Sequence, residues 1–164
     1  MKNLRFVAAL CLLIILSVPA RPAFSETAQR TQNGLFPDEI VSADELKKML
    51  DRKEKLVLFD ARDKRSFDAL HIDGAVLPRT EEYYRREELF RTSLAPQAPD
   101  ADEGLKTAME KVPHDTPIVT YCNSNCHASA TLALRLKQLG FTNVRSMEEG
   151  YQNWEKKGYP VAKK

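Results

Sequence analysis

The sequence predicts an α/β domain in which a mostly parallel sheet is covered by helices on both faces. Three short runs have the apolar, β-branched composition of strands: Leu56–Phe59, Pro117–Tyr121 and Asn143–Ser146. Segments with helical periodicity lie between these runs, and strands that alternate with helices are typical of parallel sheets. The 164 residues suit a single domain, and no internal repeat is visible.

The first 25 residues have the pattern of an export signal. Two basic residues precede an apolar run over residues 6–18, and Ala23 and Ser25 place small side chains where a signal peptidase cleaves. The run is shorter than the roughly 20 apolar residues of a membrane-spanning helix. We therefore expect a signal peptide over residues 1–25, a periplasmic or otherwise exported mature protein, and no stable membrane insertion after cleavage.

The charge balance excludes a nucleic-acid surface. The chain has 25 basic and 23 acidic residues, and three of the basic ones lie in the leader. The remaining chain is nearly neutral, with 22 basic residues against 23 acidic ones. Nucleic-acid binding needs a concentrated basic excess, so we expect no such partner.

The first elements after the leader are predicted to be scaffold. Residues 26–37 are largely polar and unpatterned, so we expect a flexible mature N-terminus there and the folded domain over residues 38–164. Ile40–Val41 suits a short strand, and Ser42–Glu45 has the capping-box pattern that opens a helix.

The predicted strand Leu56–Phe59 leads into Asp60 and Arg62, at the edge of the sheet where α/β domains place functional groups. The ordinary interpretation is an Asp–Arg pair that fastens a loop, and direct catalysis is the alternative. A short helix over Ser66–Leu70 precedes His71, and Val76–Pro78 suits a third strand. Histidine can act as a base or a ligand, but we expect a hydrogen-bonded structural role for His71.

Residues 79–102 are the least regular part of the chain. The charged block Glu81–Glu88 is compatible with a helix, and prolines indicate a loop after it. So long a connection is often a lid or a binding loop, whereas a solvated charged helix is the ordinary interpretation. The candidate substrate contacts here are Tyr83, Tyr84, Arg85 and Arg86. A further short helix is expected over Gly104–Val112.

The strongest candidate site is the turn between Pro117–Tyr121 and a helix predicted over Ala128–Leu139, with Gly140 in the C′ position. The turn contains Cys122 and Cys126, the only cysteines outside the leader. The free N–H groups and positive dipole end of a helix N-terminus favour an anion in the preceding turn. A thiol there ionises more readily than a free thiol of pKa about 8.5. The pattern favours a nucleophilic or sulfur-carrying Cys122 over a small buried hydrophobe.

Five segments together resemble the rhodanese family, a sulfurtransferase fold. They occur in the family's order and span about residues 40–161: Leu58–Arg62, His71–Ala75, Val119–Cys122, Leu139–Val144 and Trp154–Pro160. The resemblance implies a three-layer domain with a central, mostly parallel five-stranded sheet. It also implies a six-residue active-site cradle made of Cys122, Asn123, Ser124, Asn125, Cys126 and His127.

The resemblance implies that Cys122 is catalytic. In that family the cradle cysteine takes a sulfane sulfur from a donor and holds it as a persulfide until a thiophilic acceptor removes it. The implied partners are a small sulfur donor and a thiophilic acceptor or a protein thiol, with no metal or cofactor. We assign supporting roles to Asp60, Arg62 and His71.

Three features of the cradle depart from the family's pattern. The family often has Arg at the last cradle position and Gly at the fourth, where this chain has His127 and Asn125. A fixed cation for thiosulfate is therefore missing. The third departure is Cys126, which is either a resolving thiol that attacks an oxidised or persulfidated Cys122, or a solvent-facing residue without a partner. Both interpretations remain open at this point.

Other functions compete with sulfur transfer. The main alternatives are a thiol–disulfide redox protein that uses Cys122 and Cys126, and a noncatalytic rhodanese-like binding module. Haem attachment uses Cys-x-x-Cys-His, and the spacing here is one residue longer. Zinc has no evident fourth ligand beside Cys122, Cys126 and His127, so we expect neither group.

Overall fold

The computed structural model describes residues 29–164, and the expected signal peptide lies outside them. A short 3-10 helix, η1 (Pro37–Glu39), comes first. The helices are α1 (Ala43–Asp51), α2 (Lys64–Ala69), α3 (Glu81–Arg91), α4 (Ala101–Met109), α5 (Ala128–Gln138) and α6 (Gly150–Lys156). The strands are β1 (Val57–Asp60), β2 (His71–Ile72), β3 (Ile118–Tyr121), β4 (Val144–Met147) and β5 (Val161–Ala162).

The central sheet consists of three parallel strands in the order β1–β3–β4. One isolated bridge extends each edge, between Ile40 and Ser146 and between Phe59 and Val76. The predicted α/β class is confirmed, but the expected five strands are three strands with a bridge at each edge. The edge strands are short for two reasons. Helix α1 begins soon after Ile40, and Pro78, which has no N–H to donate, lies two residues after Val76. Strands β2 and β5 pair antiparallel in a separate sheet.

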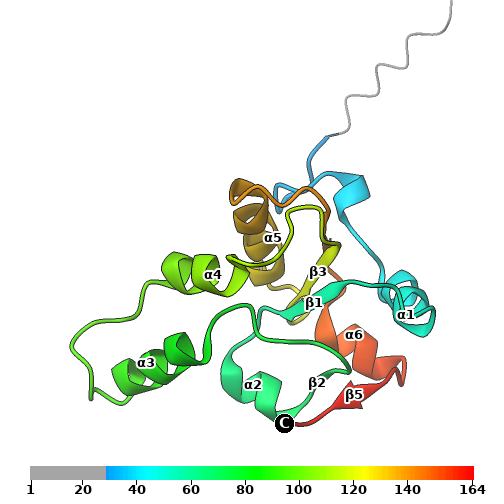
Figure 1. The fold of residues 1–164 in the computed structure, drawn as a ribbon. Coiled ribbons are helices and arrows are strands. Elements are labelled where there is room, and N and C mark those ends of the chain that lie inside the picture. The colour runs from blue at the N-terminus through cyan, green and yellow to red at the C-terminus, as the bar shows by residue number, and fades with distance from the viewer. Residues whose placement is uncertain (1–28) are drawn as a thin grey trace, which may run out of the picture.

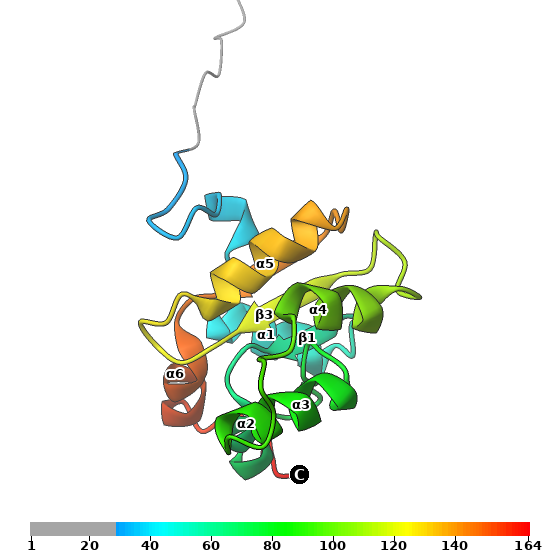
Figure 2. The same cartoon turned by 90° about the vertical axis from the view of Figure 1, so that its left-hand side faces the viewer.

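Two apolar clusters on opposite faces of the sheet give the domain three layers. Leu58 and Val119 pack with α1, α2 and α6 on one face, whereas Phe59 and Ile118 pack with α4 and α5 on the other. Neighbouring strand residues thus point to opposite faces, as a pleated strand requires. Figure 1 shows α5 and α6 on opposite sides of the strands, and Figure 2 shows α5 lying along β3.

Local sequence signals account for several helix boundaries. The side chains of Ser42, Asp63 and Thr80 each accept a hydrogen bond from the backbone N–H three residues later, at the starts of α1, α2 and α3. Such N-caps satisfy N–H groups that have no partner within the helix. Gly140 follows the end of α5 with φ +95°, as expected for a helix C′ residue.

The N-terminal segment and helix α3 differ in how firmly they are attached to the domain. The described part of the N-terminal segment, which we predicted to be flexible, is anchored: Leu35 is fully buried and the Asn33 amide donates to the Glu148 carboxylate at 2.8 Å. Helix α3 lies beside α2 at the edge of the domain (Figures 1 and 2), with only Tyr84 of its residues buried. No helix within residues 29–164 is long and apolar enough to cross a membrane.

Candidate active site

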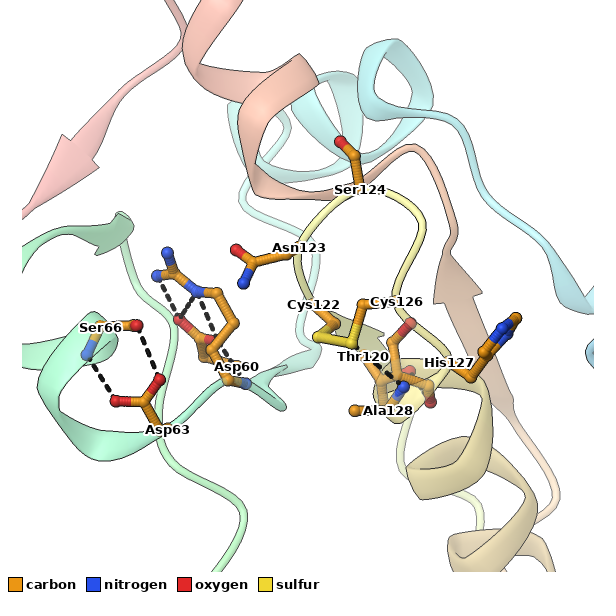
Figure 3. Close-up of a disulfide and its surroundings, with 12 residues drawn as sticks. Asp60, Asp63, Ser66, Thr120, Cys122, Asn123, Ser124, Cys126, His127 and Ala128 are labelled. Carbon is orange, nitrogen blue, oxygen red and sulfur yellow. Dashed lines mark hydrogen bonds and ion pairs between the residues drawn. A yellow bond between two sulfur atoms is a disulfide. The ribbon is translucent and has the colours of Figure 1, made fainter.

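The cradle, residues 122–127, leads from the carboxyl end of β3 to the start of α5. Cys122 is buried, and its Sγ atom forms a disulfide with Sγ of Cys126 (Figure 3). The two Cα atoms are 6.1 Å apart, within the usual range for a disulfide. The structure therefore contradicts the interpretation of Cys126 as a residue without a partner. The two sulfur atoms lie beyond the carboxyl end of β3.

Helix α6 holds the cradle from the side opposite α5. The Tyr151 N–H donates to the Cys122 carbonyl at 2.8 Å, and the Ser124 N–H donates to Oε1 of Gln152 at 2.7 Å. The Gln152 amide in turn donates to Oδ1 of Asn123 at 3.0 Å, and the Ser124 hydroxyl donates to the Glu149 carbonyl at 2.7 Å. These bonds fix the loop backbone against a helix that follows it by more than twenty residues.

Gly150, at the start of α6, makes this close approach possible. It has φ +81°, and a Cβ atom built there would lie 2.2 Å from the Ser124 nitrogen. No other residue fits such a position without displacing the cradle. Gly150 was not among the residues predicted from the sequence, because no local motif marks it.

The backbone of the cradle leaves several donors free. Within the described residues, no hydrogen bond engages the N–H groups of Asn123, Asn125 and His127, and the Ala128 N–H contacts Sγ of Cys126 at 3.4 Å. Asn125 has φ +60°, a left-handed conformation that Asn tolerates, at the position where the family often has Gly. Free N–H groups in such a turn suit an anion.

The side chain of His127 turns away from the two sulfur atoms (Figure 3). Its Nδ1 atom bonds to Oδ1 of Asn33, and the residue is exposed. The imidazole thus ties the N-terminal segment to the cradle and places no charge over Cys122.

Asp60 and Arg62 form a buried pair below the cradle. Nη2 of Arg62 lies 2.6 Å from Oδ2 of Asp60 and 2.6 Å from the Leu70 carbonyl, and the Tyr121 hydroxyl donates to Oδ2 of Asp60 at 2.7 Å. Burial and the negative charge of Asp60 raise the pKa of Tyr121. Burial opposes the Arg62 cation, but the hydrogen bond and charge of Asp60 raise its pKa overall. This geometry favours the loop-fastening interpretation over direct catalysis.

This network reaches the cradle through Tyr121, which directly precedes Cys122, and through the ring of Tyr151. The Arg62 guanidinium carbon lies 4.0 Å from the centre of the Tyr151 ring, and the Tyr151 N–H bonds to Cys122. Asp60 and Arg62 therefore support the site without pointing into it. Tyr121, whose hydroxyl also accepts the N–H of Ile72 at 3.1 Å, was not predicted as a site residue.

His71 lies apart from this site. Its side chain is buried, Nδ1 lies 2.8 Å from the Phe67 carbonyl oxygen, and its ring stacks on Phe67 with centroids 3.9 Å apart. These contacts fit the expected structural role. Within residues 29–164, no group of three or more His, Cys, Asp or Glu side chains is arranged to hold a metal ion.

A cavity of about 430 Å³ lies between α4 and α5, next to the first residue after the cradle. Its walls include Ala61, Arg79, Leu105, Ala128 and Thr131. Ala128 directly follows the cradle, and the Ala61 N–H bonds to the Tyr121 carbonyl one residue before Cys122. The four substrate contacts suggested for residues 83–86 do not line this cavity, whereas Arg79, which the sequence analysis passed over, does. A larger cavity of about 670 Å³ lies between α2 and α3.

The model of the protein family described as the rhodanese-like domain matches residues 42–157. The chain belongs to the rhodanese-like family. This confirms the family resemblance found in the sequence. The probable adenylyltransferase/sulfurtransferase MoeZ of Mycobacterium tuberculosis is 32% identical over 116 residues, 71% of this chain and 24% of MoeZ. The chain thus spans about a quarter of the length of the curated relatives it matches.

Solved structures show the same fold at lower identity. The rhodanese-like domain of the Anabaena sp. Alr3790 protein superposes with a TM-score of 0.57 at 20% identity, covering 77% of this chain and 80% of that one. The thiosulfate sulfurtransferase of Pseudomonas aeruginosa gives a TM-score of 0.51 at 21% identity, covering 76% and 20%. At such identities the structures establish the fold, and the family includes sulfurtransferases.

Proposed function

We propose that this chain is a sulfurtransferase that carries sulfane sulfur as a persulfide on Cys122. One observation carries the proposal: Cys122 is buried at the end of β3, in a loop where the N–H groups of Asn123, Asn125 and His127 make no hydrogen bond within the described residues. A persulfide adds a negatively charged sulfur beyond Sγ, and backbone N–H groups fixed in advance stabilise such a charge.

The reaction begins with Cys122 as a thiolate. Its Sγ attacks the sulfane sulfur of the donor, the bond between that sulfur and the rest of the donor breaks, and the remainder leaves with the electron pair. With thiosulfate the products are the Cys122 persulfide anion and sulfite. A thiophilic acceptor, such as the thiolate of a protein partner, then attacks the outer sulfur and releases the Cys122 thiolate.

The disulfide supports a second candidate function, in which Cys122 and Cys126 exchange electrons with other thiols. A dithiol reductant opens the bond and becomes a disulfide itself, so two electrons pass to the pair. The same bond also forms from the persulfide: the Cys126 thiolate attacks Sγ of Cys122 and expels the outer sulfur as hydrosulfide after it takes up one proton. A disulfide therefore fits both a redox protein and a sulfurtransferase that releases sulfide.

A sulfur-transfer assay separates these functions. The protein is first reduced with a dithiol, then mixed with thiosulfate or an organic thiosulfonate and with cyanide as the acceptor, and thiocyanate is measured. We expect Cys122→Ser to abolish turnover and Cys126→Ser to retain it while losing sulfide release. A wild-type protein that cycles its disulfide with dithiols but forms no thiocyanate would favour the redox function. Loss of both reactions would favour a binding module.

We also propose that the chain is exported and that residues 1–25 are removed. The proposal rests on the basic start, apolar run and small residues of the leader. Expression of the full chain in a Gram-negative host tests it. We expect the protein in the periplasmic fraction, with a mass that lacks the leader. Recovery of an uncleaved chain in the cytoplasm would contradict export.

A further inference from the structure

The cradle offers no cation to an anionic sulfur donor. The His127 imidazole bonds to Asn33 and faces away from the sulfur atoms (Figure 3). The Arg62 guanidinium is bound in two places by Asp60, and its side chain is only 5% exposed. Neither cation is free to pair with an anionic sulfur donor. In the proposed reaction the leaving group is also an anion, so another cation would be needed to bind it.

Arg79 supplies a cation in the cavity beside the cradle. Its Nε atom donates to the Ala101 carbonyl at 3.0 Å, and its guanidinium carbon lies 5.1 Å from the centre of the Tyr83 ring. Within residues 29–164, no carboxylate lies within ion-pair distance of Arg79, whereas Arg135 in the same cavity is paired with Asp102 at 2.6 Å. Arg79 is thus positioned by neutral groups and keeps its charge available.

Apart from Arg79, Thr131 and the paired Asp102 and Arg135, the cavity is lined by apolar residues. Ala61, Leu105, Ala128 and Leu132 contribute apolar side chains to its walls. Its volume of about 430 Å³ lies within the range of small-molecule sites and exceeds what a small inorganic anion fills. A ligand with an apolar body and one negative group matches these walls.

We propose that this cavity binds the leaving part of the sulfur donor, with Arg79 paired to its anionic group. The donor class is an organic thiosulfonate or a similar small organic anion. Transfer then converts the thiosulfonate and the Cys122 thiolate into the Cys122 persulfide and a sulfinate, with two negative charges on each side. This proposal rests on the proposed function and gives the segment over residues 79–102 a role in donor specificity.

Binding of a sulfinate tests the site without any sulfur chemistry. Benzenesulfinate and its neutral analogue methyl phenyl sulfone are titrated into full-length Cys122→Ser/Cys126→Ser protein, and the backbone amide signals of Ala61, Ala128 and Thr131 are followed by NMR. We expect the sulfinate to shift these signals and the sulfone to bind at least tenfold more weakly. Arg79→Gln should remove the difference, since charge-assisted hydrogen bonds are about twice as strong as neutral ones.

Three further variants control the experiment. Arg79→Lys keeps the charge and should recover part of the affinity, whereas Thr131→Leu reduces the space and should weaken both ligands. Arg52→Gln makes the same charge change outside the cavity, where Arg52 pairs with Glu54, and should bind sulfinate as the parent protein does. Equal sulfinate affinity in the Arg79→Gln and Arg52→Gln proteins, with both folded, would overturn the proposal.

A loading experiment separates this proposal from the proposed function. The Cys126→Ser and Arg79→Gln/Cys126→Ser proteins are reduced and treated with benzenethiosulfonate, and persulfide formation is measured by mass. We expect Arg79→Gln to raise the concentration for half-maximal loading about tenfold with little change in the maximal rate. Loading that is independent of Arg79 would refute the donor site alone. Sulfinate binding that depends on Arg79, without loading of Cys122, would refute the sulfurtransferase proposal alone.

Discussion

The cradle and helix α3 are held to the domain in opposite ways. Four hydrogen bonds from the start of α6 reach the backbone and side chains of the cradle, and a buried Asp–Arg–Tyr network lies below it. Helix α3 buries one side chain, Tyr84, and its ion pairs are exposed. The proposed persulfide needs backbone N–H groups that are held in place, so we expect the cradle to tolerate fewer changes than α3.

The largest effect is expected from Gly150→Ala. The new Cβ atom would overlap the cradle backbone, so the change should destabilise the protein by about 2–4 kcal/mol and displace the loop. Gly158→Ala is the matched control, because Gly158 also has positive φ, at +69°, but nothing lies within 4 Å of a Cβ there. Chemical denaturation should show a loss of only about 1–2 kcal/mol for the control. Equal losses of unfolding free energy in the two variants would mean that the cradle does not depend on the close contact between Gly150 and Ser124.

Tyr121→Phe should have the next largest effect. It leaves one Asp60 oxygen without the hydroxyl and the buried N–H of Ile72 without its acceptor, at a cost of about 1–3 kcal/mol. Tyr84→Phe makes the same change in α3, where the hydroxyl is buried and has no hydrogen-bond partner among the described residues. We expect little change in unfolding free energy for that variant. A larger loss for Tyr84→Phe than for Tyr121→Phe would reverse the comparison.

A smaller effect is expected at the surface of α3. Arg85 pairs with Glu82 at 2.8 Å, but the two side chains are 65% and 58% exposed. Solvent screens such pairs, so Arg85→Gln should change the unfolding free energy by less than about 0.5 kcal/mol. The same variant tests the earlier suggestion that Arg85 contacts substrate. A clear loss of persulfide loading would show that α3 approaches the cradle.

The smallest effect is expected from Asp100→Asn, which should change the stability of the protein only at acidic pH. Asp100 caps α4, and hydrogen bonds from the N–H groups of Glu103 and Asp102 lower its pKa. Its contribution to stability is therefore present above the ordinary pKa of about 3.9 and is lost as the pH falls through the lower folded-state value. Asp100→Asn keeps a cap but does not titrate. Thermal melts from about pH 7 to pH 2.5 should show that the wild-type protein loses more stability in acid than this variant.

Much of the fold could be predicted because its signals are local. The apolar runs at β1, β3 and β4, the N-cap at Ser42 and the glycine after α5 each depend on neighbours within a few residues. The tolerance of Asn125 for a left-handed backbone is local as well. The lengths of the edge strands were less predictable, since they depend on where α1 begins and on Pro78, two residues after Val76.

The surroundings of the cradle were less predictable because they join distant parts of the chain. Gly150 and Arg79 become significant only when α6 and α4 are placed beside the cradle. Asn33 lies in a polar segment, yet its side chain bonds to His127, 94 residues later. No periodicity or short motif indicates such contacts. The turn with Cys122 and Cys126 could be found because its cysteines, preceding strand and following helix are consecutive in the sequence.

The most direct test of sulfur transfer is the intact mass of the mature protein. The protein is reduced with a dithiol, treated with a sulfane-sulfur donor, and measured alongside the Cys122→Ser and Cys126→Ser variants. We predict a cyanide-labile gain of about 32 Da in the Cys126→Ser protein, which has no second thiol to expel the added sulfur, and none in Cys122→Ser. No gain in any protein, with a loss of about 2 Da that needs both cysteines, would contradict persulfide chemistry and leave the disulfide as the functional state.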